Sequence, residues 1–168
     1  AFAADAAFAT NFLELQTTGT VTGTAGVIDL NTSTSDLVVR SGGVVNLSTA
    51  AHDFNTIAIT TGATASAVTV NDTNALTIGT VDTLNGIATG AGQIDVVAGG
   101  ALDVAHQVTN TTTSDINLSG VGVDLSTANS DVTTTGGTGN ITIDANTGNF
   151  NMFAGSTVIT TTNDITIS

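Results

Sequence analysis

The stretch Ile141-Thr142-Ile143-Asp144 decides the fold, because the same short pattern returns along the chain. Apolar residues occupy its odd positions and polar residues its even positions, which is typical of a strand with one buried side. Equivalent triplets start every 22 to 26 residues, at Val45, Val68, Ile94, Ile116, Ile141 and Ile165. A sustained period of this length predicts a solenoid, in which each unit buries its apolar face against its neighbours.

Each period has room for three strands separated by turn residues. The period from Ile94 contains a second strand at Leu102-Asp103-Val104 and a third that begins near Val108. The next two periods place these strands at Val123-Asp124-Leu125, Val132, Phe150-Asn151-Met152 and Val158. We therefore expect an all-β parallel β-helix over residues 12–168, with about three strands in each of about seven turns. Strands about 4.8 Å apart would then give a rod of roughly 35 Å.

The core is expected to consist of stacked aliphatic side chains. One column is Val45, Val68, Ile94, Ile116, Ile141 and Ile165, and its neighbour is Leu47, Val70, Val96, Leu118, Ile143 and Ile167. A β-sandwich also uses short alternating strands, but the sustained period and the like-on-like columns favour the solenoid. Alternation is expected throughout residues 12–168, including the less regular strands Phe12 to Leu15 and Val27 to Leu30.

Residues 1–11 (AFAADAAFATN) are rich in Ala and lack this alternation. They are expected to form a cap or lead-in, with a short helix, over the first turn. Solenoids need such caps because their end turns expose unpaired backbone groups.

The charge balance excludes several classes of partner. The net charge is −13, with 14 acidic residues, Arg40 as the single Arg and no Lys. Such a surface repels nucleic acid and anionic lipid. Without Cys there is no disulfide or thiolate metal site, and no apolar run is long enough to insert in a membrane. Thr makes up about a fifth of the chain and suits exposed strand positions. This composition predicts a secreted or cell-surface protein.

Two segments resemble a known family. Residues 52–59 (HDFNTIAI) lead into residues 68–79 (VTVNDTNALTIG), and residues 98–102 read AGGAL. This is similar to the repeats of filamentous-haemagglutinin-like adhesins, giant bacterial surface proteins whose repeats often read N-D-F, a short strand, then D-x-N-A-L-T-[IL]-G. The resemblance covers residues 44–168. It implies a right-handed parallel β-helix on an exported protein of an envelope-bearing bacterium.

The sequence offers few groups for catalysis. His52 and His106 lie at different points of the period, without metal-ligand spacing, and are expected at solvated loop positions. Asp53 follows His52, but no Ser stands in a G-x-S-x-G context to use the pair.

Carboxylates are the remaining candidates for chemistry. Asp95, Asp103 and Asp124 fall on outward strand positions, and glycoside cleavage needs two carboxylates that face one cleft. Tyr and Trp, which stack on sugars, are absent, and Arg40 is the one strong cation. No catalytic residue is assigned and the chain is predicted not to be an enzyme, with a polysaccharide-active β-helix as a remote alternative.

Calcium and ice binding are weakly indicated. Residues 136–143 (GGTGNITI) partly match a calcium-binding nonapeptide, but Asn140 replaces the expected Asp and the match occurs once. No metal or cofactor residue is assigned, and only weak Ca²⁺ association with the acidic surface is expected. Four outward threonines do not form a regular ladder, which leaves ice binding as another remote alternative: Thr77, Thr133, Thr142 and Thr166.

These observations predict a structural or adhesive β-helical segment of an extracellular or cell-surface bacterial protein. The alternative is a self-assembling extracellular filament subunit, because Ile165-Thr166-Ile167-Ser168 begins another turn. The expected partners are other copies stacked end to end, further repeats of the same protein, and glycans of host or neighbouring cells. Neither nucleic acid nor membrane insertion is expected.

Overall fold

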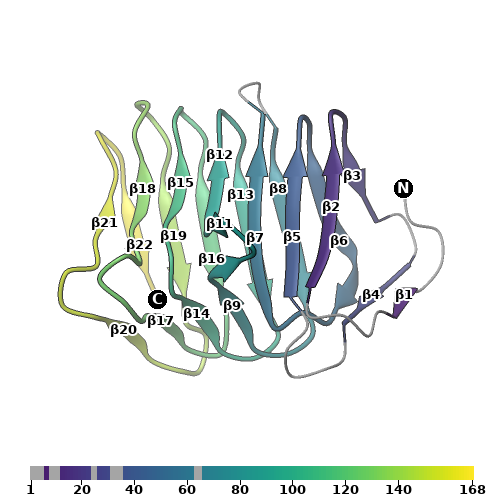
Figure 1. Cartoon of the computed structure of the whole chain (residues 1–168). Helices are drawn as coiled ribbons and strands as arrows, with labels where there is room; N and C mark the ends of the chain where they lie inside the picture. Colours follow the sequence, from purple (N-terminus) through teal and green to yellow (C-terminus); the bar gives the residue numbers. More distant parts are fainter. Residues whose placement is uncertain (1–5, 8–11, 24–25, 31–35, 63–65) are drawn as a thin grey trace.

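The computed structural model describes residues 6–7, 12–23, 26–30, 36–62 and 66–168. In this described part the backbone winds into a coil of stacked parallel strands with three faces, and no helix is present (Figure 1). The prediction of an all-β parallel solenoid is confirmed. The coil makes about six turns, where about seven were expected.

Face A is the most regular of the three and contains seven parallel strands. They are β3 (Val21–Thr22), β6 (Val45–His52), β8 (Val68–Asp72), β13 (Ile94–Ala98), β16 (Ile116–Ser119), β19 (Ile141–Asp144) and β22 (Ile165–Ile167). The register pairs Ile94 with Ile116 and Ile116 with Ile141. Both predicted aliphatic columns, which start at Val45 and Leu47, are confirmed along their whole length.

Faces B and C are formed by separate short strands in the later turns. Face B contains β9 (Leu76–Ile78), β14 (Leu102–Val104), β17 (Val123–Leu125) and β20 (Phe150–Met152). Face C contains β12 (Ile87–Thr89), β15 (Val108–Asn110), β18 (Val132–Thr134) and β21 (Val158–Ile159). The second and third strands expected in the three periods from Ile94 onward are therefore confirmed.

In the early turns one long strand covers both of these faces. The long strands are β2 (Phe12–Thr17), β5 (Asp36–Ser41) and β7 (Thr56–Thr61). β7 joins the two arrangements, because its Ile57 pairs with β9 and its Ile59 pairs with β12. A long strand can therefore stack on two short strands even where an insertion separates them.

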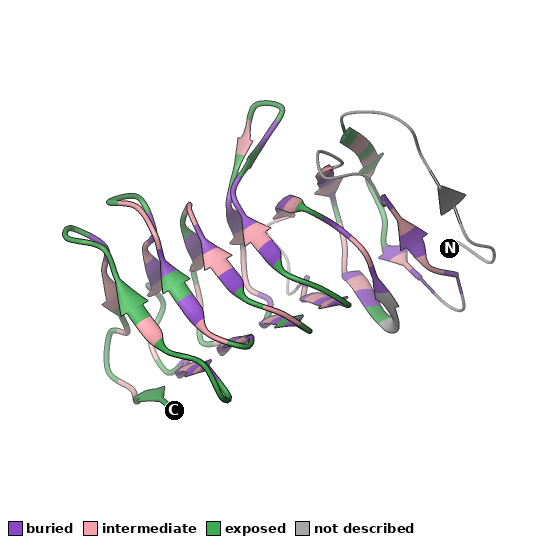
Figure 2. Ribbon diagram, turned by 90° about the horizontal axis from the view of Figure 1, so that it is seen from below, coloured by how far each residue is buried: buried purple, intermediate pink, exposed green. Residues whose placement is uncertain are grey.

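The interior is a stack of aliphatic side chains that water does not reach. Ile94, Ile116 and Ile141 are all 0% exposed, and Figure 2 shows buried and outer positions alternating along the middle turns. Fully burying each such side chain contributes about 1.5–3 kcal/mol. Because the strands are short, this stacking between turns supplies most of the stabilising burial.

The first turns differ from expectation in two ways. Val21 pairs in register with Val45, so the face A column begins one period earlier than predicted. The two expected early strands are present as β2 and β4 (Ile28–Asp29), and β4 pairs with β1 (Ala6–Ala7). The expected short helix is wrong at Ala6 and Ala7, because these residues form a parallel ladder with β4. The rest of residues 1–11 lies outside the described residues.

A polar side chain secures the corner between faces C and A at six successive places, after β5, β7, β12, β15, β18 and β21. Ser41, Thr61, Thr89, Asn110, Thr134 and Thr160 each donate a hydrogen bond to a carbonyl of the following turn loop, on Gly43, Ser66, Gly92, Ser114, Gly139 and Asn163 respectively. Thr134 is 0% exposed. A buried hydroxyl costs free energy unless it is hydrogen-bonded. The loop carbonyl that accepts this hydrogen bond explains why the last inward-facing residue before each of these corners can be polar.

Thr134→Val should lower the free energy of unfolding by about 1–2 kcal/mol, because it keeps the shape of the side chain and removes the donor to Gly139. Thr133→Val is the matched control, since Thr133 is half-buried on the outer side of the same strand. It should change stability by no more than about 0.5 kcal/mol. Urea unfolding followed by circular dichroism measures both, and equal losses would contradict the role of the corner hydrogen bond.

Candidate functional site

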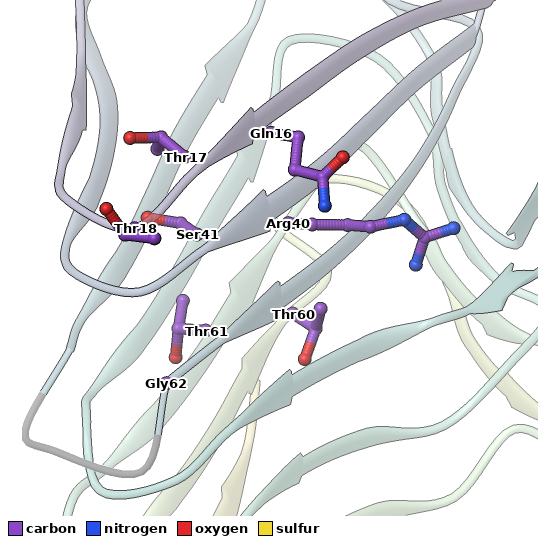
Figure 3. Close-up of a pocket in the computed structure, with 8 residues that line it drawn as sticks. All are labelled: Gln16, Thr17, Thr18, Arg40, Ser41, Thr60, Thr61 and Gly62. Carbon is purple, nitrogen blue, oxygen red and sulfur yellow. The ribbon is translucent and has the colours of Figure 1, made fainter.

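A surface hollow of about 610 Å³ lies across β2, β5 and β7 near the corner that leads to face A (Figure 3). It is lined by Gln16, Thr17, Thr18, Arg40, Ser41, Thr60, Thr61 and Gly62. Gln16, Arg40 and Thr60 are register partners, so their side chains form one outward row across three strands. We call this hollow the face C groove. Its hydroxyl and amide groups can donate and accept hydrogen bonds with a polar ligand.

Arg40 contributes little free positive charge to this groove. Its Nε donates to Glu14 Oε1 at 3.1 Å, and its Nη2 donates to Asp82 Oδ2 at 3.1 Å and to Thr83 Oγ1 at 3.2 Å. In Figure 3 its guanidinium points away from the end of the groove formed by Thr17 and Thr18. Since two carboxylates neutralise the guanidinium, the face C groove favours neutral polar ligands over anions.

The second of these carboxylates belongs to a hairpin that the sequence analysis missed. β10 (Thr80–Val81) and β11 (Leu84–Asn85) pair antiparallel between β9 and β12. Asp82 in the turn has a φ of 54°, and Gly86 at the exit has a φ of 66°. A Cβ at Gly86 would lie 2.0 Å from the carbonyl oxygen of Gln107, so only Gly fits this close approach.

The hairpin folds back over the outer surface of the long strands. Val81 and Leu84 pack on Val38 of β5 and Ala58 of β7, both of which are 0% exposed. The predicted alternation is therefore wrong in these two strands, because the hairpin buries positions that should face water. The signal was available in two unbroken apolar triplets, LVV at 37–39 and IAI at 57–59.

Arg40→Gln should loosen the hairpin without disturbing the coil, because it removes the ion pair with Asp82 and the hydrogen bond to Thr83 in the turn. We expect faster amide hydrogen exchange at residues 80–86 and unchanged exchange in face A, measured by mass spectrometry. Thr109→Ala is the control, since Thr109 is a half-buried outer residue of face C away from the hairpin. Unchanged exchange in the hairpin of the Arg40 variant would show that the apolar contacts alone hold it.

His52 is buried and not solvated as expected. Its side chain is 0% exposed, its Nδ1 accepts the Ile28 N–H at 2.9 Å, and its ring stacks on Phe54 with centroids 5.4 Å apart. Burial lowers the pKa of His52, so the ring is neutral and serves as a core acceptor. The prediction failed because a His at a solenoid corner can point inward when a neighbouring Phe covers it.

His106 lies at the corner between faces B and C and is half-buried in a turn. Together with Asn85, Gln107, Asn129 and Asp131 it lines a polar hollow of about 340 Å³. Asp131 is already engaged, because its Oδ1 accepts the backbone N–H of Thr157 at 2.9 Å. The two histidines therefore lie at different corners of the coil, as their positions in the period predicted.

Asp72 is a second buried ionisable group that the sequence analysis did not single out. It is 1% exposed, and it accepts the N–H groups of Phe54 at 2.7 Å and of Asn74 at 2.8 Å. Burial raises the pKa of Asp72 to about 6, against the lowering effect of these two hydrogen bonds, and the charge of Asp53 raises it further. The N-D-x-N sequence, typical of an Asx-turn, was the available signal.

Asp72 should make stability fall as the pH rises from about 4 to about 6. Its folded pKa lies above the value of an unfolded Asp, so in this window the folded state binds more protons than the unfolded state. Asp72→Asn should remove this part of the pH dependence. The measurement is the urea midpoint of both proteins from pH 4 to pH 7, and parallel profiles would contradict the assignment.

The structure separates the three outward carboxylates. Asp103 and Asp124 are register partners on face B, whereas Asp95 lies on face A. Asp95 accepts from Asn117 Nδ2 at 2.6 Å, and Asp124 accepts from Asn151 Nδ2. None of the three lines the face C groove or the hollow beside His106. Two of the three outward carboxylates are therefore already hydrogen-bonded to a side-chain amide of the next turn.

The segment that resembles a calcium nonapeptide serves as a turn between stacked coils. A Cβ at Gly136 would lie 2.3 Å from the Thr111 carbonyl oxygen of the previous turn. The backbone N–H of Asn140 donates to Asp115 Oδ1 at 2.8 Å. The side-chain Oδ1 of Asn140 accepts the N–H of Asp164 at 3.4 Å. Within the described ranges, no group of three or more His, Asp or Glu side chains is arranged to hold a metal ion.

The four outward threonines do not share one surface. Thr142 and Thr166 are neighbours on face A, whereas Thr77 lies on face B and Thr133 on face C. In the part of the chain that the structure describes, no helix has the length and apolarity needed to cross a membrane.

Comparisons with protein-family models, curated proteins and solved structures found no match. The coil itself establishes a parallel β-solenoid repeat protein.

Proposed function

We propose that this chain is a structural and adhesive segment of an extracellular or cell-surface bacterial protein, and that it does not catalyse a reaction. The stiff coil would hold its outer faces and corner loops at fixed positions for contact with another surface. The resemblance of residues 44–168 to filamentous-haemagglutinin-like repeats supports this proposal.

The observation that carries the proposal is the continuity of the ladder and the core. On face A the register runs without a break from Ile94 to Ile165, and the aliphatic columns follow it. The two buried ionisable groups, His52 and Asp72, accept backbone hydrogen bonds, and the corner hydroxyls such as Thr134 donate to backbone carbonyls. These groups therefore stabilise the rod, which leaves the outer surface for recognition.

The face C groove is the place where we expect an adhesive contact. Its row of Gln16, Arg40 and Thr60 offers amide, guanidinium and hydroxyl donors, and hydroxyl acceptors, at the spacing of adjacent strands. Neutral glycans of host or neighbouring cells present hydroxyl groups that suit such a surface. The acidic remainder of the molecule would associate weakly with cations such as Ca²⁺.

Two other functions are less favoured. A polysaccharide-active enzyme would have to use the stacked Asp103 and Asp124 on face B, but these residues line neither the face C groove nor the hollow beside His106. Ice binding would need a regular threonine row on one face, and face A places Asp95 and Asn117 within that row.

Binding of the labelled chain to a glycan array and to cell surfaces tests the adhesive role. Gln16→Ala combined with Thr60→Ala should reduce binding at least several-fold. Thr109→Ala combined with Thr133→Ala is the matched control, because these residues lie in the same outward row of face C outside the groove. Absence of binding to any surface would contradict adhesion, and equal loss in both double variants would contradict the groove as its site.

A further inference from the structure

The hairpin of β10 and β11 contains the single Asn-Gly pair of the sequence, Asn85-Gly86. Asn85 is the last residue of β11 and is exposed, and Gly86 follows it where the chain returns to face C. An Asn side chain can react with the backbone nitrogen of the next residue, and a following Gly has no Cβ to block that approach. Asn is among the thermolabile residues of proteins. By sequence, Asn85 is therefore the Asn most prone to lose its amide.

The reaction consumes water and needs no other reagent. The Gly86 nitrogen gives up its proton to solvent and attacks Cγ of Asn85, the Cγ–Nδ2 bond breaks, and the amide nitrogen leaves as ammonia. Water then opens the resulting cyclic imide at either of its carbonyls. One product is Asp, and the other is isoaspartate, in which the main chain runs through Cγ and is longer by one carbon. Overall, an amide and water become a carboxylic acid and ammonia.

The closed hairpin holds this reaction back. The Gly86 N–H donates to the carbonyl of Gly79 at 2.8 Å, so the attacking nitrogen is engaged at the base of the hairpin. The Asn85 Oδ1 accepts the Thr80 hydroxyl at 2.7 Å, which ties the side chain to the opposite strand. Ring closure requires the Gly86 nitrogen to leave Gly79 and the Asn85 side chain to turn away from Thr80. The base of the hairpin must therefore open first.

Gly86 is also the point at which the hairpin joins the coil. Its carbonyl accepts the Ile59 N–H at 2.9 Å, and the Ile87 N–H donates to the Gln107 carbonyl at 2.9 Å. A Cβ at Gly86 would lie 2.0 Å from that carbonyl oxygen. The backbone here fits closely between two neighbouring turns, so a main chain longer by one carbon cannot keep the same register. Isoaspartate in place of Asn85 would therefore displace the hairpin from its closed position.

The hairpin is suited to open while the coil stays folded. Each of its strands is two residues long, and a short two-stranded hairpin is marginally stable alone. The contacts that close it are the packing of Val81 and Leu84 on Val38 and Ala58, and an exposed, hence weak, ion pair of its turn with Arg40. Opening breaks no ladder between turns, because β7 pairs directly with β9 and β12.

We propose that Asn85 is a site of spontaneous deamidation that the closed hairpin controls, and that its conversion to isoaspartate releases the hairpin from the coil. This inference goes beyond the proposed adhesive role and does not depend on it. The cover over Val38 and Ala58 then lasts only as long as Asn85 stays intact. Release also takes Asp82 away from Arg40, and so changes the charge beside the face C groove.

Asn129 provides an internal comparison. It precedes Ser130, whose side chain is small, and it lines the same polar hollow as Asn85. The Ser130 N–H donates to the Thr127 carbonyl at 3.1 Å, in the turn between β17 and β18. This turn belongs to the coil and does not move with the hairpin. A change that opens the hairpin should therefore accelerate the reaction of Asn85 and leave that of Asn129 unchanged.

Peptide mapping by mass spectrometry, during incubation of the whole chain at mildly alkaline pH, measures the loss of each amide. We expect Asn85 to react at least several-fold more slowly in the folded chain than in the chain unfolded in urea, because folding exposes the Gly86 nitrogen only during opening. A folded chain in which Asn85 reacts as fast as in the unfolded chain would overturn control by the hairpin.

Leu84→Ala and Arg40→Gln should each accelerate the deamidation of Asn85 at least several-fold, because each removes a contact that closes the hairpin. Thr109→Ala is the matched control, since Thr109 is a half-buried outer residue of face C away from the hairpin. Circular dichroism verifies that all three variants fold. Rates at Asn85 that stay at the wild-type value in both hairpin variants would contradict the proposal.

Amide hydrogen exchange of the aged chain tests the release. Molecules with isoaspartate at position 85 should exchange faster at residues 80–86, keep their exchange in face A, and bind more of the apolar dye ANS. Asn85→Gln, aged in the same way, is the matched control, because the longer Gln side chain closes the equivalent ring much more slowly. Equal protection of the hairpin in the fresh and isoaspartate forms would refute the release. None of these readouts uses adhesion, so a chain that binds no cell surface would sink the adhesive role and leave this inference intact.

Discussion

Each turn of this protein is held by the turns on either side of it, through one ladder of parallel backbone hydrogen bonds. On face A the N–H of an inward aliphatic residue donates to the following turn, and the side chain of that residue lies on its equivalent. Neither contact is available to an isolated turn, because its short strands bury nothing alone. The remaining features of the molecule serve to keep successive turns in this register or to use the surface that it creates.

Polar residues inside the coil follow from that constraint. The corners must bend the chain three times per turn, and bending leaves carbonyl and N–H groups that the ladder cannot pair. Thr134 and its equivalents satisfy carbonyls at the corner between faces C and A, while Asp72 and His52 satisfy N–H groups at the next corner. Their burial raises the pKa of Asp72 and lowers that of His52, so their altered ionisation has a structural explanation and is not by itself a sign of catalysis.

The outer surface divides into parts with different chemistry. The hairpin covers an apolar patch on the long strands, and the face C groove next to it offers mainly hydroxyl and amide groups. On faces A and B, Asp95 and Asp124 each accept a hydrogen bond from the amide of a neighbouring turn, Asn117 and Asn151 respectively.

The repeat in the sequence determined the solenoid, the register of face A and the strands from Ile94 onward, because a period-2 pattern that recurs every turn has one way to bury its apolar side. Local pattern could not place the hairpin, since Val38 and Ala58 are buried by residues far along the chain. It could not show that His52 and Asp72 point inward, or that Arg40 joins two distant carboxylates. Those features depend on contacts between residues that lie far apart in the sequence. Only the tertiary structure decides which of these residues come together.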